Sequence, residues 1–89
     1  MISKNKKTAT AAERAHRDRV KELPCSVCDT PGPSSAHHID QNCEWTLVAL
    51  CYGCHQGRNG LHGGTKAMWK IKKMNEVDAL GVTIMRLMK

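Results

Sequence analysis

Apolar residues recur at intervals of three and four in two segments toward the C-terminal end of the chain. The first set is Met68, Ile71 and Met74, and the second is Val77, Leu80, Ile84 and Leu87. Such intervals place residues on one face of an α-helix. The pattern therefore predicts two helices within residues 65–88, the first capped by Thr65 and the second beginning at Asn75.

A further helix is predicted near the N-terminus by its capping signals. Thr10 and Glu13 have the spacing of a capping box. Residues 11–22 are mostly good helix formers, and Leu23-Pro24 ends the segment because the residue before a proline avoids helical geometry. The basic side chains and His16 of this helix are expected on an exposed surface. Residues 1–9 are predicted to be a flexible basic arm, followed by a single domain at 10–89.

Two short segments in the middle of the chain favour β structure. Residues 45–50 form an apolar run that predicts a strand. Residues 30–35 are rich in proline, glycine and serine and predict a loop, after which residues 35–39 can extend as a partner strand. Two strands with helices around them predict a small α+β fold.

Four cysteines form two Cys-x-x-Cys hooks, Cys25 with Cys28 and Cys51 with Cys54. Each hook can grip one side of a tetrahedron, so the two together predict a structural Zn²⁺ site. Two disulfides are the alternative, but they need an oxidising compartment, and the polar N-terminal residues provide no apolar leader for export. We therefore expect a cytoplasmic protein. The fifth cysteine, Cys43, is expected to be a small buried apolar residue.

Composition and charge agree with a metal-stapled domain that binds nucleic acid. The chain has 89 residues with no Phe, one Tyr and two Trp, so its core is small and a metal staple is expected. It carries 14 Lys and Arg against 8 Asp and Glu, a formal net charge of +6. This balance favours DNA as the partner, with a solvated basic surface as the alternative. No apolar run is long enough to span a membrane.

Three histidines lie in and beside the hooks. His37 and His38 fall between them, and His55 directly follows the last cysteine. Because four cysteines already fill a tetrahedral site, these imidazoles are candidates for a second, reactive cation. Neighbouring residues on a strand point to opposite sides, so one imidazole can bind the cation while the other reaches an attacking water. The alternative is that one histidine completes the zinc shell and the other is exposed.

Taken in order, Cys-x-x-Cys, Ala-His-His-Ile and Leu-Val-Ala-Leu-Cys-x-x-Cys-His resemble the zinc-stapled HNH endonuclease motif over residues 25–62. The continuation Cys-His-x-Gly-x-x-Gly-x-His-Gly, residues 54–63, resembles phage-encoded Ref nucleases, which cut DNA held by a recombinase filament. The resemblance implies a treble-clef-like ββα-metal core with flanking helices. It also implies metal-dependent cleavage of DNA in phage recombination, in the bacterial host cytoplasm, with a recombinase filament as a possible partner.

In that family the first histidine of the pair is a metal ligand and the second is the general base. The resemblance thus assigns His37 and His55 to the reactive cation and His38 to the water. His62 and then Asn59 are further candidate ligands, because imidazole is the commoner ligand of a borderline metal. Mg²⁺ is the expected reactive ion, with Mn²⁺ and Zn²⁺ as alternatives.

One position departs from the family pattern. The family usually has an Asn that orients the base just before the second strand, and Thr46 stands there in this chain. Either Thr46 substitutes, or a backbone carbonyl orients His38, and Asn42 is a spare candidate. The alternative function is a non-catalytic zinc module that binds DNA or a protein, and the sequence leaves the oligomeric state open.

Overall fold

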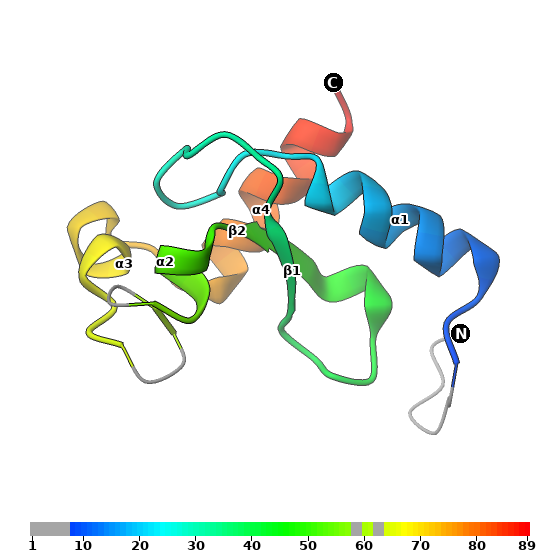
Figure 1. Ribbon diagram of the computed structural model, residues 1–89, viewed down its shortest axis with the longest axis horizontal. Coiled ribbons are helices and arrows are strands. Elements are labelled where there is room, and N and C mark those ends of the chain that lie inside the picture. The colour runs from blue at the N-terminus through cyan, green and yellow to red at the C-terminus, as the bar shows by residue number, and fades with distance from the viewer. Residues whose placement is uncertain (1–7, 58–59, 62–63) are drawn as a thin grey trace.

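The computed structural model describes residues 8–57, 60–61 and 64–89 (Figure 1). In chain order the elements are α1 (Ala11–Lys21), β1 (Ser35–His38), the 3-10 turn η1 (Glu44–Thr46), β2 (Leu47–Leu50), α2 (Tyr52–His55), α3 (Ala67–Lys72) and α4 (Glu76–Leu87). This arrangement confirms the predicted α+β class, with one two-stranded sheet and helices packed around it. None of the described helices is long and apolar enough to cross a bilayer.

The two strands form an antiparallel hairpin whose second strand is covered along its outer edge. Ser26 in the first hook donates its N–H to the Ala49 carbonyl at 2.8 Å, and the Ala49 N–H donates to the Thr83 hydroxyl of α4 at 3.3 Å. An uncovered edge would leave these backbone groups without protein partners. The hairpin of four-residue strands is therefore held in place by two segments: the first hook, which precedes it in the chain, and α4, which follows it.

Side chains of β2 alternate between two apolar clusters, which is why the whole strand is buried. Leu47 and Ala49 pack with Val20 of α1. Val48 and Leu50 point the other way, into a larger cluster of Cys25, Val27, Cys54, Trp69 and Ala79. The larger cluster contains one cysteine from each hook, so the core and the cysteine hooks are a single packing unit. Helices α2 and α3 lie at this end of the molecule and α1 at the other (Figure 1).

The helix starts predicted at Thr10 and Asn75 are both present. The Thr10 side chain accepts from the Glu13 N–H while Glu13 accepts from the Thr10 N–H, which confirms the start of α1. Asn75 caps α4 as expected, and it does so in a reciprocal pair with Asp78. These bonds join residues three apart, so each helix start is fixed locally.

The predicted core faces of α3 and α4 are confirmed in part. The residues that pack against the apolar clusters are Met68, Met74, Leu80 and Leu87. Ile71, Val77 and Ile84 were expected to point inward, but they are 70, 69 and 44% exposed. Trp69 and Thr83 are buried in their place. The rotation of α4 is set by Thr83, whose hydroxyl meets the Ser26 hydroxyl at 2.7 Å and the backbone of β2. In this rotation of α4, Val77 and Ile84 face solvent.

Two element boundaries also differ from the prediction. Helix α3 begins at Ala67 after Lys66, which has a left-handed φ of 59°, so Thr65 does not cap it. Trp45 and Thr46 belong to η1 rather than to β2. The Thr46 hydroxyl donates to the Cys43 carbonyl at 2.9 Å, and this local bond competes with an extended strand.

Candidate metal centre and histidine site

The four cysteines of the two hooks come together in space. Their sulfur atoms all lie within 4.8 Å of one another, and Cys28 Sγ is 3.6 Å from Cys51 Sγ. A zinc–sulfur bond of about 2.3 Å gives a tetrahedral edge of roughly 3.8 Å, so the spacing fits a four-thiolate zinc site. All five cysteines are described and all are free thiols, which excludes the disulfide alternative in this structure. Cys43 is 4% exposed and lies outside the cluster, as predicted.

The first hook is a tight turn closed by backbone hydrogen bonds. The Cys25 N–H donates to the Thr30 carbonyl at 2.8 Å, and the Asp29 N–H donates to the Cys25 carbonyl at 3.0 Å. Asp29 has a φ of 64°, a left-handed conformation that Asp tolerates better than most residues. The Val27 N–H points at Cys25 Sγ at 3.5 Å. A donor aimed at sulfur stabilises a thiolate, which is the form that binds metal.

The crowding of the thiols makes a cation necessary if all four are to ionise. Burial acts to raise the pKa of Cys28, but hydrogen bonds from Thr30, Cys51 and Cys25 outweigh it and lower the pKa to about 7. Burial together with the nearby Cys25 raises the pKa of Cys54. Burial also raises the pKa of Cys51. The first thiolate therefore forms readily, whereas further negative charge is opposed until a divalent ion compensates it.

His37 is buried on the inner side of β1, where it faces α2 and α4. Its exposed fraction is 5%, and its ring centroid lies 5.0 Å from that of His55 with the planes at 65°. Its Nε2 is 2.7 Å from the Glu76 carboxylate in the first turn of α4. Two imidazoles this close can share one ion. The structure therefore brings together two of the three residues that were predicted to bind or use the reactive cation.

The ring of His55 is oriented by the first residue of β1. Ser35 Oγ donates to the Leu50 carbonyl at 3.0 Å and lies 2.8 Å from His55 Nδ1. A hydroxyl has one proton, and the carbonyl takes it, so the His55 Nδ1–H donates to Ser35 Oγ. In the neutral ring this hydrogen bond puts the lone pair on Nε2, which is the atom that can bind a cation.

His38 points to the opposite side of β1 from His37. Its Nε2 donates to the carboxylate of Glu44 in η1, and the other oxygen of that carboxylate accepts from Arg17 of α1. Burial acts to raise the pKa of Glu44, but the hydrogen bonds from His38 and Arg17 lower it. The ionised carboxylate can only accept, so in the neutral His38 ring the lone pair is on Nδ1. A quarter of the His38 side chain is exposed, which gives water access to it.

Glu44, and not the predicted Thr46, is the hydrogen-bond partner that orients His38. The Thr46 hydroxyl bonds instead to the backbone of Cys43 and Asp40, and Asn42 donates its N–H to the Asp40 carboxylate. Thr46 thus shapes the loop that delivers Glu44. Arg17 was expected on an exposed charged face, and its ion pair with Glu44 corrects that expectation.

The two remaining candidate ligands, Asn59 and His62, lie outside the described residues, as do the lysines of the N-terminal arm. The residues described between them, Gly60 and Leu61, pack against α2. A Cβ on Gly60 would lie 2.8 Å from the His55 carbonyl oxygen, and the Leu61 N–H donates to the Cys54 carbonyl at 3.3 Å. The glycine is therefore required by close backbone approach at the end of the helix that carries His55.

Sequence reasoning missed the acidic partners of the histidine pair. Glu44 is six residues from His38, and Glu76 is 39 residues from His37 in an element outside the motif. A glutamate in a helix start is a common capping feature, so neither position carries a spacing signal of its own.

Comparison of the chain with protein-family models, with curated proteins and with solved structures found no match. The chemistry of the site is therefore inferred from its residues and geometry.

Proposed function

We propose that this chain is a metal-dependent DNA endonuclease of the HNH type, in which one divalent cation and a histidine base hydrolyse a phosphodiester bond. The observation that carries the proposal is the division of the histidine pair across β1. His37 faces His55 at a ring distance of 5.0 Å, whereas His38 turns to the other side and is held by Glu44. A purely structural zinc module needs neither histidine contact, because neither imidazole belongs to the cysteine cluster.

Each residue then has a chemical task. His37 and His55 hold the cation, and Asn59 and His62 are proposed as further ligands. The ion, with Mg²⁺ expected, supplies charge neutralisation at the phosphate when it is bound. His38 Nδ1 accepts a proton from the attacking water, whose oxygen bonds to phosphorus as the bond to the leaving oxygen breaks. The net charge of +6 supports DNA as the substrate.

A second candidate is a non-catalytic zinc module that binds DNA or a protein. One observation favours it: among the described residues, the four-cysteine cluster is the only group of three or more potential ligands with closely spaced ligand atoms. This candidate predicts binding without cleavage, whatever divalent ion is supplied.

Cleavage of supercoiled plasmid and of single-stranded DNA, with Mg²⁺ or Mn²⁺ and with or without a strand-exchange recombinase, separates the two candidates. His38→Ala is expected to lower the nicking rate by about 10²- to 10⁴-fold, the usual contribution of a general base. Zinc content and the circular dichroism spectrum are expected to be unchanged, because His38 lies outside the cysteine cluster. Gln56→Ala, at an exposed position beside His55, is the control and keeps the wild-type rate.

Nicking by His38→Ala at the wild-type rate removes this histidine from the mechanism. Absence of cleavage by the wild-type protein on every DNA form, with the zinc site loaded, favours the binding module.

A further inference from the structure

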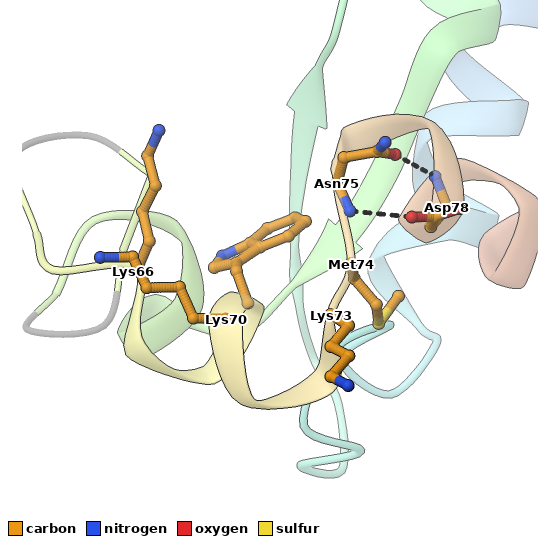
Figure 2. A pocket seen from close by; sticks show the side chains of 7 residues that line it. Lys66, Lys70, Lys73, Met74, Asn75 and Asp78 are labelled. Atoms are coloured by element: carbon orange, nitrogen blue, oxygen red, sulfur yellow. Dashed lines mark hydrogen bonds between the residues drawn. The ribbon is translucent and has the colours of Figure 1, made fainter.

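An open groove of about 320 Å³ lies between α3 and the start of α4 (Figure 2). Lys66, Lys70 and Lys73 line it, and we call it the lysine groove. Lys70 lies within α3, and Lys66 and Lys73 flank the helix at its two ends, both with left-handed φ values. The indole of Trp69 contributes to the lining and is fixed by a hydrogen bond from Nε1 to the Cys54 carbonyl at 3.0 Å. The groove thus has a rigid apolar wall and a basic rim.

The charge of the groove favours an anionic occupant. Three lysines line it against one acidic residue, Asp78, so the lining residues together carry a net charge of two positive units. Asp78 already accepts the Asn75 N–H at 3.0 Å as part of the α4 cap, as Figure 2 shows. Its charge is therefore directed at the helix terminus.

The remaining lysine of α3 points elsewhere. The pKa of Asp29 is lowered by a hydrogen bond from Arg86 and by the positive charges of Arg86 and Lys72. Lys72 therefore lies near the first hook, and it does not line the groove. Lys72 and Lys73 are adjacent in sequence, yet only Lys73 lines the groove, which provides a matched comparison at the C-terminal end of α3.

The groove and the candidate histidine site are linked through consecutive residues at the start of α4. Asn75 forms part of its lining, and the next residue is Glu76, whose carboxylate contacts His37 at 2.7 Å. We propose that the lysine groove docks the phosphodiester backbone of DNA beside the bond to be cut. The location of the cut rests on the proposed nuclease function, but docking itself is a binding property. Lysines suit this occupant because phosphate contacts supply most of the sequence-independent affinity for DNA.

The experiment measures the affinity of the zinc-loaded 89-residue chain for fluorescein-labelled duplex DNA by anisotropy, without added divalent cation, from about 50 to 200 mM salt. Each phosphate contact contributes about 0.9 to the slope of log affinity against log salt. The double substitution Lys70→Gln, Lys73→Gln is expected to flatten the slope by about 1.8. Over this fourfold change in salt, its loss of affinity then becomes roughly tenfold smaller than that of the wild type.

The control is Lys72→Gln combined with Lys21→Gln, which removes the same charge from exposed positions outside the groove. It is expected to change the slope by less than half as much. Lys70→Arg with Lys73→Arg retains both charges and the wild-type slope. Equal slopes for the groove and control substitutions, or a flat salt response of the wild type, overturn the proposal.

Failure of docking and failure of the nuclease give different results. If the wild type cuts no DNA but only the groove substitutions flatten the slope, docking stands and the nuclease proposal fails. If the wild type cuts DNA and the groove and control substitutions bind with equal slopes, the nuclease proposal stands and docking fails.

Discussion

At the scale of single residues, Glu44 connects α1 to the end of β1 through one carboxylate. Its two oxygens accept from His38 and Arg17, and its side chain is only 12% exposed. Hydrogen bonds from both partners lower its pKa against the effect of burial, so it stays ionised near neutral pH. An ionised acceptor at Nε2 keeps the lone pair of neutral His38 on Nδ1. Glu44 is therefore a positioning residue for the proposed base.

Replacement of this carboxylate by an amide tests that role. We expect Glu44→Gln to lower the rate of plasmid nicking by about 10- to 100-fold, because an amide can also donate to Nε2 and so stabilise the other tautomer of His38. Zinc content and the circular dichroism spectrum are measured on the same samples, so that a loss of rate is separated from a loss of folding.

The matched control is Glu22→Gln, the same change at the exposed C-terminal cap of α1. It should leave the rate at its wild-type value. A wild-type rate for Glu44→Gln would show that the carboxylate has no part in orienting the histidine.

At the scale of elements, α1 packs against η1 through an aromatic contact as well as through the Glu44 ion pair. The ring centroids of His16 and Trp45 are 4.9 Å apart. Within the described chain His16 Nε2 is buried without a hydrogen-bond partner. Burial and the nearby charge of Arg19 lower the pKa of His16, while Glu44 offsets part of this effect. His16 was expected to be a surface residue, and the structure makes it part of an interface between two elements.

This contact predicts a pH dependence of stability. Because the folded-state pKa lies below the unfolded value of about 6.5, folding favours neutral His16. Its contribution is complete above pH 6.5 and is lost as the pH falls from there through the lowered folded-state pKa. His16→Phe keeps an aromatic ring on Trp45 but cannot titrate. We expect its melting temperature to fall less than that of the wild type between pH 7.5 and 6.0.

Differential scanning fluorimetry of the zinc-loaded proteins makes this comparison, with His16→Phe and wild type measured in the same buffers. Parallel melting temperatures across this interval would mean that His16 does not couple protonation to folding.

At the scale of the whole molecule, the cysteine cluster joins segments that flank the hairpin. Cys25 and Cys28 precede β1, whereas Cys51 and Cys54 follow β2. Cys25 and Cys54 also belong to the larger apolar cluster. A bound ion would therefore close the hairpin from both ends and hold the core at the same time. Structural zinc contributes about 10–16 kcal/mol in small finger domains, which equals or exceeds the net stability of most domains.

We expect a chelator that removes the ion, or the substitution Cys51→Ala, to abolish the native far-UV circular dichroism spectrum. Zinc per chain, measured by plasma mass spectrometry, should fall in parallel. Cys43→Ala is the matched control, because Cys43 is buried but lies outside the cluster. It should retain the ion and the native spectrum and cost about 1 kcal/mol of stability.

A Cys51→Ala protein with a native spectrum and no bound zinc would show that the apolar clusters suffice to fold the chain. The same loss of structure in both cysteine substitutions would point to core packing rather than to metal binding.

Bonds between residues close in sequence were predictable. The helix starts at Thr10 and Asn75 depend on groups three positions apart. The turns of the cysteine hooks depend on groups four or five positions apart, so the sequence specifies both partners there as well. The opposite directions of His37 and His38 follow in the same way, because neighbouring residues of a strand alternate. The order of the hooks was enough to predict four converging thiols, since a soft cation is the common partner of such a set.

Contacts between distant elements were decided only by the tertiary structure. Apolar residues surround α4 on several sides, so their spacing does not choose a face, and the helix takes the rotation that satisfies the buried hydroxyl of Thr83. That choice exposes Val77 and, at the helix start, brings Glu76 to His37. The approach of Glu44 to His38 likewise depends on how η1 folds under α1. Hydrogen bonds between residues close in sequence can be predicted from the sequence. The rotation and docking of whole helices cannot, because they depend on which of several possible surfaces is buried most favourably.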